Sequence, residues 1–378
     1  MQRLIFANQL RGIAVLAVVF SHLVGVFWGM RDFVGLASAS PAQSGPPPDL
    51  FILVSHPWFN FGPFGVGLFF LISGLVIPFS LERHTRGTFL MARALRIYPT
   101  YAAALLIEMA VLHAGSLYWQ RPFPYDLWTI VTNLLLLHLL SGFPSVDLVN
   151  WTLGVELKFY LVMCLAAPMI LRGRVGVLFV MAGLIIASHL MLMLPPIAAV
   201  AARQPDISRQ LSTDSLFLIF MFMGVLFYCH ARGLLSAPAF CLGLGTMLLL
   251  FLGCWRVSLI SEQFPGVAVN YLYGFVMFSL AYLGQRHARP LIILDFFASI
   301  SYPLYLVHSI IGYSILKILM LTHGFSYEIA LPMALGAVII LATALHHTVE
   351  RLSISLGQAL ASPRGMRTAS IPVTGRPG

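Results

Sequence analysis

Charged residues are scarce in this chain of 378 residues: only 9% are Asp, Glu, Lys or Arg, and lysine occurs only at positions 158 and 317. A soluble globular domain carries about 25% charged residues, so this chain has too few to cover a surface that faces water. That deficit excludes a soluble enzyme, a disordered protein and a secreted disulfide scaffold. Cysteine is also rare, with four residues and no C-x-x-C spacing, which predicts small buried side chains and no metal site.

Apolar residues dominate instead: 59% of the chain is hydrophobic, and the mean hydropathy is +0.89. Since a membrane-spanning helix takes about 20 such residues, the composition predicts an all-α polytopic transmembrane helix bundle of about ten spans. A further apolar segment near 130–140 is too short to span and is predicted to be re-entrant or interfacial. The predicted spans are residues 10–30, 61–81, 97–115, 152–171, 175–195, 214–230, 238–257, 266–284, 298–321 and 329–347.

The net charge of +9 comes from arginine, which supplies 20 of the 22 basic residues. In a soluble protein this bias would suggest nucleic-acid binding, but in a membrane protein basic residues gather in cytoplasmic loops. If the 130–140 segment does not cross and the N-terminus is cytoplasmic, fifteen arginines are cytoplasmic and five lie outside. The distribution therefore predicts that both termini are cytoplasmic.

Arg11 and His22 are ionisable residues of the first predicted span. Their separation of eleven residues is close to three helical turns, so both lie on one face, roughly 16 Å apart along the axis. An ionisable residue at membrane depth marks a functional site by default. The alternatives are that Arg11 anchors the topology and that His22 is a packed histidine bonded to a neighbour.

Arg93 and Arg96 lie between the second and third predicted spans. Because they are three residues apart on a helix, both guanidinium groups can face one polyanion. A phosphate-bearing ligand at the cytoplasmic face would suit this pair. Contact with anionic lipid headgroups is the alternative interpretation.

Glu156 and Trp151 stand at the start of the span predicted over residues 152–171. A carboxylate at this position could orient a histidine or form a charge pair with it during acid–base catalysis. The alternative is an interfacial glutamate beside Lys158. Trp151 is typical both of an aromatic belt at the membrane interface and of a stacking platform for a sugar.

Ser301, Tyr305 and His308 are spaced i, i+4 and i+7 and therefore share one helix face. Such a face predicts a hydrogen-bonding site in the bundle interior, with interhelical polar contacts as the alternative. His138 and His189 have no evident partner in the sequence and receive no role.

Five segments, taken in order, resemble the acyltransferase 3 family of integral-membrane O-acyltransferases. They are 10–22 (an Arg ten intervening residues before a His), 65–75 (GVGLFFLISGL), 93–99 (RALRIYP), 151–160 (WTLGVE followed by FY) and 301–308 (SYPLYLVH). The resemblance implies one transmembrane acyltransferase domain over residues 1–351. The basic residues 352–378, rich in Pro, Gly and Ser, are predicted to form a disordered cytoplasmic tail. One departure is the pair Leu157-Lys158, where the family often has a second acidic or amide residue.

The resemblance also implies an activity: transfer of an acyl group, commonly acetyl, from acyl-coenzyme A to a hydroxyl of a carbohydrate or other acceptor. The protein would then work in a bacterial plasma membrane, with acyl-CoA as co-substrate, the lipid bilayer as surroundings, no resident cofactor, no metal and no nucleic acid. In this hypothesis the phosphates of coenzyme A are bound by Arg93 and Arg96, with Arg11, and His22 is the general base. The residues that orient the base or stabilise the oxyanion are Glu156, Ser301, Tyr305 and His308. Trp151 would lie near the acceptor.

Other mechanisms and functions remain open at this point. Direct attack by the acceptor is favoured over a covalent acyl-enzyme, because no residue stands out as an activated nucleophile. The alternative function is a ten-span transporter or flippase with intramembrane histidines as a proton relay. That alternative predicts repeated halves with broken helices, and the sequence shows no such repeat. A catalytically inactive scaffold is a third interpretation.

Overall fold

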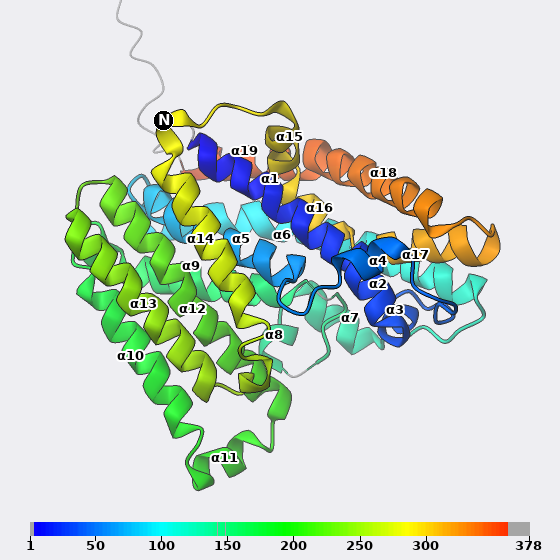
Figure 1. Cartoon of the computed structure of the whole chain (residues 1–378), viewed down its shortest axis with the longest axis horizontal. Coiled ribbons are helices and arrows are strands. Elements are labelled where there is room, and N and C mark those ends of the chain that lie inside the picture. Colours follow the sequence, from blue (N-terminus) through cyan, green and yellow to red (C-terminus); the bar gives the residue numbers. More distant parts are fainter. Residues whose placement is uncertain (1–3, 142, 148, 362–378) are drawn as a thin grey trace, which may run out of the picture.

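The computed structural model describes residues 4–141, 143–147 and 149–361, and nearly all of its regular structure is helical (Figure 1). Within these ranges the extended pairing is limited to an isolated bridge between His56 and Phe59. The all-α class predicted from composition is therefore confirmed.

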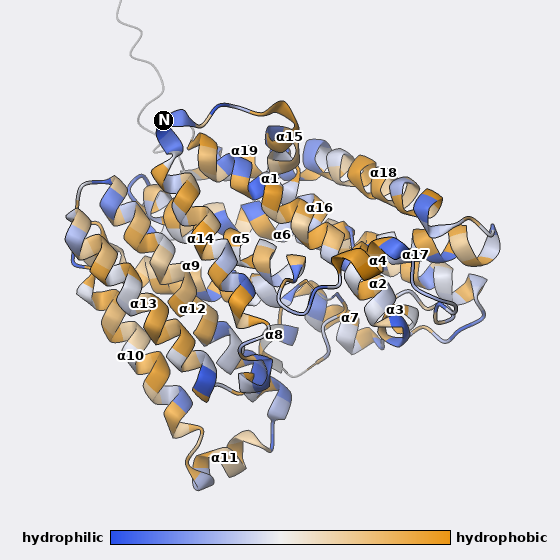
Figure 2. Cartoon of the chain, viewed as in Figure 1, coloured by the Kyte–Doolittle hydropathy of each residue, from blue (hydrophilic) through white to orange (hydrophobic). Residues whose placement is uncertain are grey.

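In the described part of the chain, seven helical stretches are long and apolar enough to cross a membrane. Apolar residues run along these helices (Figure 2), which satisfy their own backbone hydrogen bonds, as a lipid environment requires. The stretches are Ile5–Gly29 (α1 Ile5–Phe20, the π-helix η1 Ser21–Val26 and α2 Phe27–Gly29), α5 Phe61–Leu81, α6 Arg86–Tyr118, α9 Trp151–Ile170, α12 Pro205–Ala231, α13 Ala237–Val257, and Tyr327–Leu360 (α18 Tyr327–Leu345, the π-helix η5 His346–Glu350 and most of α19 Arg351–Ala361).

Two bent helix pairs raise the number of candidate spans to nine if each pair counts as one. Helices α10 Gly176–Met191 and α11 Pro195–Ala201 meet at 90°. Helix α16 Ser301–Val307 and the stretch Ile310–Thr322, made of α17 Ile310–Lys317 and the π-helix η4 Ile318–Thr322, meet at 54°. The predicted count of ten is not confirmed, because the segment at 266–284 forms α14 Ala268–Leu283, whose 16 residues are short for a span.

The segment near 130–140 forms two short helices that are too short to cross a membrane, in line with the prediction. The tail differs from its prediction: residues 352–361 are helical in α19, which packs along α6, and the later residues lie outside the described part of the chain. The remaining short helices are α3 Arg31–Ala37, α4 Asp49–Val54, α7 Leu127–Leu134, α8 His138–Ser141, η2 Ser261–Gln263, η3 Gln285–His287 and α15 Ile292–Ser299.

Side-chain caps fix where several helices begin. Asn60, Thr85 and Asp126 precede α5, α6 and α7, and each accepts a hydrogen bond from a backbone N–H in the first turn, at 2.9, 3.3 and 2.7 Å. These residue types are the preferred N-caps because a short polar side chain satisfies an otherwise unpaired donor. The same backbone hydrogen bond, from Thr129, holds the pKa of Asp126 below its ordinary value.

Helix α5 lies at the centre of the bundle and packs against α1, α9, α12 and α14 (Figure 1). Its closest approach to α12 occurs at Gly74 and Gly224. A Cβ atom on Gly74 would lie 2.2 Å from the carbonyl oxygen of Met221 and 2.8 Å from the Cα of Gly224. Small residues let two backbones approach in this way, so Gly74, the last glycine of the 65–75 motif, has a packing role.

Candidate active site

Three cavities follow one another through the bundle, with volumes of about 990, 100 and 190 Å³. We call them the large, middle and end cavities. The large and middle cavities share Val66 and Tyr305 in their walls, whereas the middle and end cavities share Arg11, Arg96 and Ser301. Because neighbouring cavities share walls, small side-chain movements would join them into one path.

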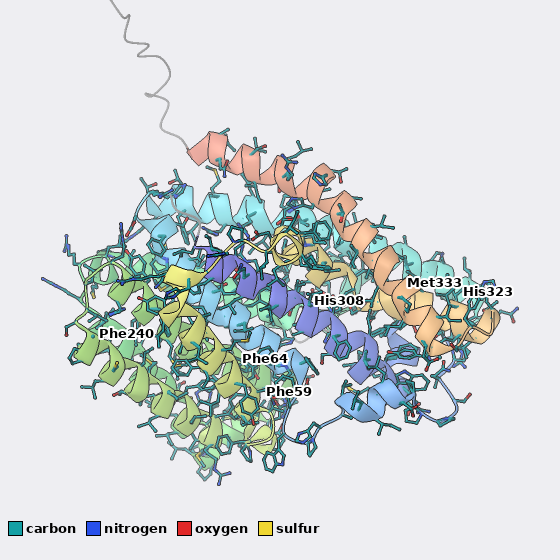
Figure 3. The ribbon with its side chains drawn as sticks, turned by 45° about the horizontal axis from the view of Figure 1, so that its top comes forward. Phe59, Phe64, Phe240, His308, His323 and Met333 are labelled. Carbon is teal, nitrogen blue, oxygen red and sulfur yellow. The ribbon has the colours of Figure 1, made fainter. Side chains whose placement is uncertain are left out.

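His22 and His308 form a pair at the large cavity. His22 lies in the π-helix η1 and lines this cavity, and His308 is fully buried at the break between α16 and α17, beside α1 (Figure 3). The Nδ1 atom of His22 is 3.0 Å from the Nε2 atom of His308, and the ring centroids are 4.8 Å apart. Both histidines thus occupy irregular helix positions, which often mark functional sites.

Hydrogen bonding assigns the protons of this pair when both rings are neutral. The Nδ1 atom of His308 faces the carbonyl oxygens of Leu304 and Tyr305, at 3.1 and 2.9 Å. Carbonyl oxygens only accept, so this nitrogen carries the proton of His308 and its Nε2 must be the acceptor. His22 therefore donates from Nδ1, which leaves the lone pair of its Nε2 free to accept a proton.

The arginine side chains pair differently from the sequence prediction. Arg11 and Arg96 line both the middle and the end cavities, whereas Arg93 lines none of the three. The guanidinium group of Arg93 lies over the rings of Phe89 and Tyr160, at 5.4 and 5.7 Å from their centroids. The face that a polyanion could reach is therefore built by Arg11 of α1 and Arg96 of α6, with Arg93 packed against aromatic rings.

Glu156 lies in the wall of the middle cavity, away from the large cavity that His22 lines. Its carboxylate accepts a hydrogen bond from the hydroxyl of Tyr160, one turn further along α9, and attracts Arg11 electrostatically. In the described part of the chain no hydrogen bond joins Glu156 to His22. The partner of His22 in the structure is therefore His308, where the sequence suggested Glu156. Glu156 lies in the wall of the middle cavity with Arg11 and Arg96.

Tyr305 separates the two cavities. Its side chain lines both the large and the middle cavity, and its hydroxyl hydrogen-bonds to the hydroxyl of Thr152 at 2.9 Å. Ser301 of the same face lines the middle and end cavities and donates to the backbone carbonyl of Ala298 in the preceding helix α15. Ser301 and Tyr305 of the predicted face thus line the row of cavities, whereas His308 lines none of the three and contacts His22.

Trp151 lines the large cavity, where its ring packs against Phe70 and Phe217 with centroids 6.1 and 5.4 Å apart. This position leaves the stacking interpretation of Trp151 open, since a flat aromatic ring beside a cavity suits the apolar face of a sugar.

Sequence reasoning missed an ion pair beside the site. The ammonium group of Lys158 bonds to the carboxylate of Asp214 on α12, whose side chain is fully buried and also accepts a hydrogen bond from Gln210 at 2.7 Å. The sequence offers Lys158 only in the alternative interpretation of Glu156, as an interfacial neighbour of that carboxylate. The available signal was Asp214 itself, an acidic residue at the start of an apolar run.

The comparisons with known proteins identify the family of this chain. The described residues include no group of three or more His, Cys, Asp or Glu side chains that could hold a metal ion. The chain matches the model of the acyltransferase 3 family, described as an acyltransferase domain, over residues 4–347. It therefore belongs to that family, and its helices and family make it an integral membrane protein with support for acyltransferase activity. No curated protein and no solved structure matches the chain.

Proposed function

We propose that this protein transfers an acyl group, acetyl in the first instance, from acyl-coenzyme A to a hydroxyl of a carbohydrate or other acceptor. The setting is a bacterial plasma membrane, with both termini in the cytoplasm. One observation carries the proposal: His22, held by His308, lines the large cavity, and this cavity shares the wall at Val66 and Tyr305 with the cavity lined by Arg11 and Arg96. A base and an anion-binding face then serve two substrates from opposite ends of one path.

The arginine end suits the donor. Coenzyme A carries several phosphate charges, and guanidinium groups bind phosphate through paired hydrogen bonds. Arg11 and Arg96 would hold these phosphates, with Arg93 supporting the site through its packing on Tyr160. The narrow pantetheine arm would then run through the middle cavity, so that the thioester arrives at Tyr305.

The reaction follows from the protonation state of the pair. The Nε2 atom of His22 takes the proton of the acceptor hydroxyl while its oxygen attacks the thioester carbonyl carbon. A C–O bond forms, the C–S bond breaks, and the departing sulfur takes the proton back from His22 to leave as the free thiol. We assign the charge on the carbonyl oxygen to the hydroxyl groups of Tyr305 and Thr152, which line the middle cavity and hydrogen-bond to each other. No acyl-enzyme is formed in this scheme.

Turnover by a His22→Ala variant tests this proposal. Purified protein in lipid nanodiscs would receive radiolabelled acetyl-CoA and an extract of gene-deleted cells as the acceptor source. Loss of the base should reduce acyl transfer about 10²–10⁴-fold. Transfer at the wild-type rate in a folded His22→Ala protein would contradict the proposal. Release of free coenzyme A in the wild type separates it from the transporter alternative, since a transporter consumes no acyl-CoA.

The same preparation tests the donor site with a matched pair of variants. Arg96→Gln should weaken coenzyme A binding about ten-fold or more, because it removes a charged hydrogen-bonding partner of the phosphates. Arg93→Gln should have a smaller effect, since Arg93 lines none of the three cavities. Isothermal titration with coenzyme A measures both, and equal losses would overturn the assignment of Arg96 to the cavity.

A further inference from the structure

His138 in α8 combines burial, missing partners and a cavity. It lines the large cavity and is only 6% exposed, yet neither ring nitrogen forms a hydrogen bond of normal geometry with a described residue, and the polar contact of the ring with the backbone of Thr132 falls outside that geometry. The other described side chains with a buried, unpartnered polar atom, such as Thr100 and Tyr313, line none of the three cavities. Buried polar groups are nearly always hydrogen-bonded, so an exception beside a cavity points to a partner that binds there.

His189 shows how this chain treats a structural histidine. It is 1% exposed, and its two ring nitrogens lie 2.9 Å from the carbonyl oxygen of Ile185 and 3.2 Å from that of Ser212. Carbonyl oxygens only accept and a neutral imidazole has one N–H, so His189 donates one hydrogen bond, to one of these two carbonyls. His138 has no contact of this geometry with a described residue although it is buried to a similar degree.

The backbone before His138 is held in an unusual conformation. Leu136, between α7 and α8, has a φ of 58°, in the left-handed region that bulky residues rarely adopt. Neighbouring contacts keep the segment there: the side chain of Asn133 bonds to the carbonyl of Pro144 and the N–H of Val146, at 2.9 and 3.0 Å. Backbone strain of this kind clusters at ligand-binding sites, where the surroundings enforce it.

The charges around His138 favour a neutral ligand. Burial lowers the pKa of His138 to about 4, so at neutral pH the ring is uncharged and offers one donor and one acceptor. Elsewhere in the wall of the large cavity, Arg209 is paired with Glu262, and Asp206 supplies a carboxylate. Arg11 and Arg96 line the middle and end cavities, whereas the arginine in the described wall of the large cavity is already paired. An anionic acceptor would therefore gain little from this wall. A hydroxyl group, which both donates and accepts, matches a neutral imidazole.

We propose that His138 is an acceptor-binding residue, and that the acceptor is a neutral, hydroxyl-rich molecule such as an uncharged sugar unit. Its hydroxyl groups supply the partners that the ring nitrogens lack, while the ring of Trp151 lines the same cavity. Rotation of the imidazole about its Cβ–Cγ bond exchanges nitrogens with carbons at constant shape, so either edge of the ring can present a nitrogen to a ligand. This inference rests on the proposed acyl transfer and names its acceptor class.

The first test needs no acceptor. His138→Phe removes two unpartnered polar atoms and should leave the melting temperature of the ligand-free protein unchanged or raise it. His189→Phe, the matched control, removes the hydrogen bond to a backbone carbonyl and should lower the melting temperature. A fall for His138→Phe equal to that for His189→Phe would overturn the proposal, because it would show that His138 is a packing residue.

The second test measures transfer from radiolabelled acetyl-CoA to the methyl glycosides of glucose, galactose and rhamnose. His138→Phe should raise the acceptor KM at least ten-fold with coenzyme A affinity unchanged, and His138→Gln should restore part of the loss. An unchanged acceptor KM overturns the role of His138. Transfer to none of these glycosides, or preferential transfer to methyl glucuronide, overturns the neutral sugar class. Failure of the wild type to bind coenzyme A would instead refute the proposed function.

Discussion

Replacing His308 with leucine should slow acyl transfer by about one order of magnitude without abolishing it. Leucine removes the acceptor that lies 3.0 Å from the Nδ1 atom of His22. A net hydrogen bond contributes roughly 0.5–1.5 kcal/mol, which corresponds to about a 2- to 13-fold change in rate. His22 keeps its basic nitrogen in this variant but loses the contact that selects the productive tautomer and holds the ring.

The assay is single-turnover transfer from radiolabelled acetyl-CoA, measured across a range of pH for the wild type, His308→Leu and His308→Gln. Glutamine is the matched control because its side-chain oxygen can accept from His22 where Nε2 of His308 does now. It should recover most of the rate that leucine loses. A purely structural role for His308 would instead lower the melting temperature of both variants and leave the pH profile unchanged.

A double-mutant cycle completes this test. If His308 acts through His22, the His22→Ala, His308→Leu protein should be no slower than His22→Ala alone, because the residue being oriented is already gone. Multiplicative losses from the two changes would refute the reasoning. A wild-type rate for folded His308→Leu would do the same.

Two further predictions concern the scaffold. Gly74→Ala should lower the melting temperature, because its Cβ would lie 2.2 Å from the carbonyl oxygen of Met221, whereas Gly245→Ala, with open space around it, should not. Burial opposes ionisation of Glu82, but hydrogen bonds from Arg232 at 2.7 Å outweigh it and lower its pKa. The ionised Glu82 carboxylate therefore stabilises the folded protein fully above 4.5, its ordinary pKa, and this contribution is lost as the pH falls through the lower pKa of the folded state. Urea unfolding should therefore show Glu82→Gln less stable than the wild type at pH 7, with the difference disappearing in acid.

Much of the scaffold could be predicted because its causes are local. Long apolar runs become helices in lipid wherever they are long enough, so composition predicts the class and most span positions. The count was less secure, because α14 is short and two other candidate spans are bent. In one of them Pro195 begins the second helix, and the residue before a proline avoids the helical conformation, which ends α10 early.

The site residues were recognisable singly, since an ionisable side chain in an apolar helix needs a reason to be there. Their partners were not recognisable, because partners are set by how helices pack. The i,i+3 spacing of Arg93 and Arg96 suggested a shared ligand, but packing turns Arg93 toward Tyr160 and leaves Arg96 with Arg11. Glu156 was likewise expected near His22 and lies instead in the middle cavity.

The sequence by itself determined that this is a helical membrane protein of the acyltransferase 3 family, because composition and short motifs depend only on the order of residues. Only the tertiary structure decided that His22 pairs with His308, 286 positions away, and which nitrogen of His22 is free. It also decided that His138 lies buried at the same cavity, with neither ring nitrogen in a hydrogen bond of normal geometry to a described residue. Such facts depend on a π-helical turn, a helix break and interhelical contacts a few ångströms long, none of which follows from helical periodicity.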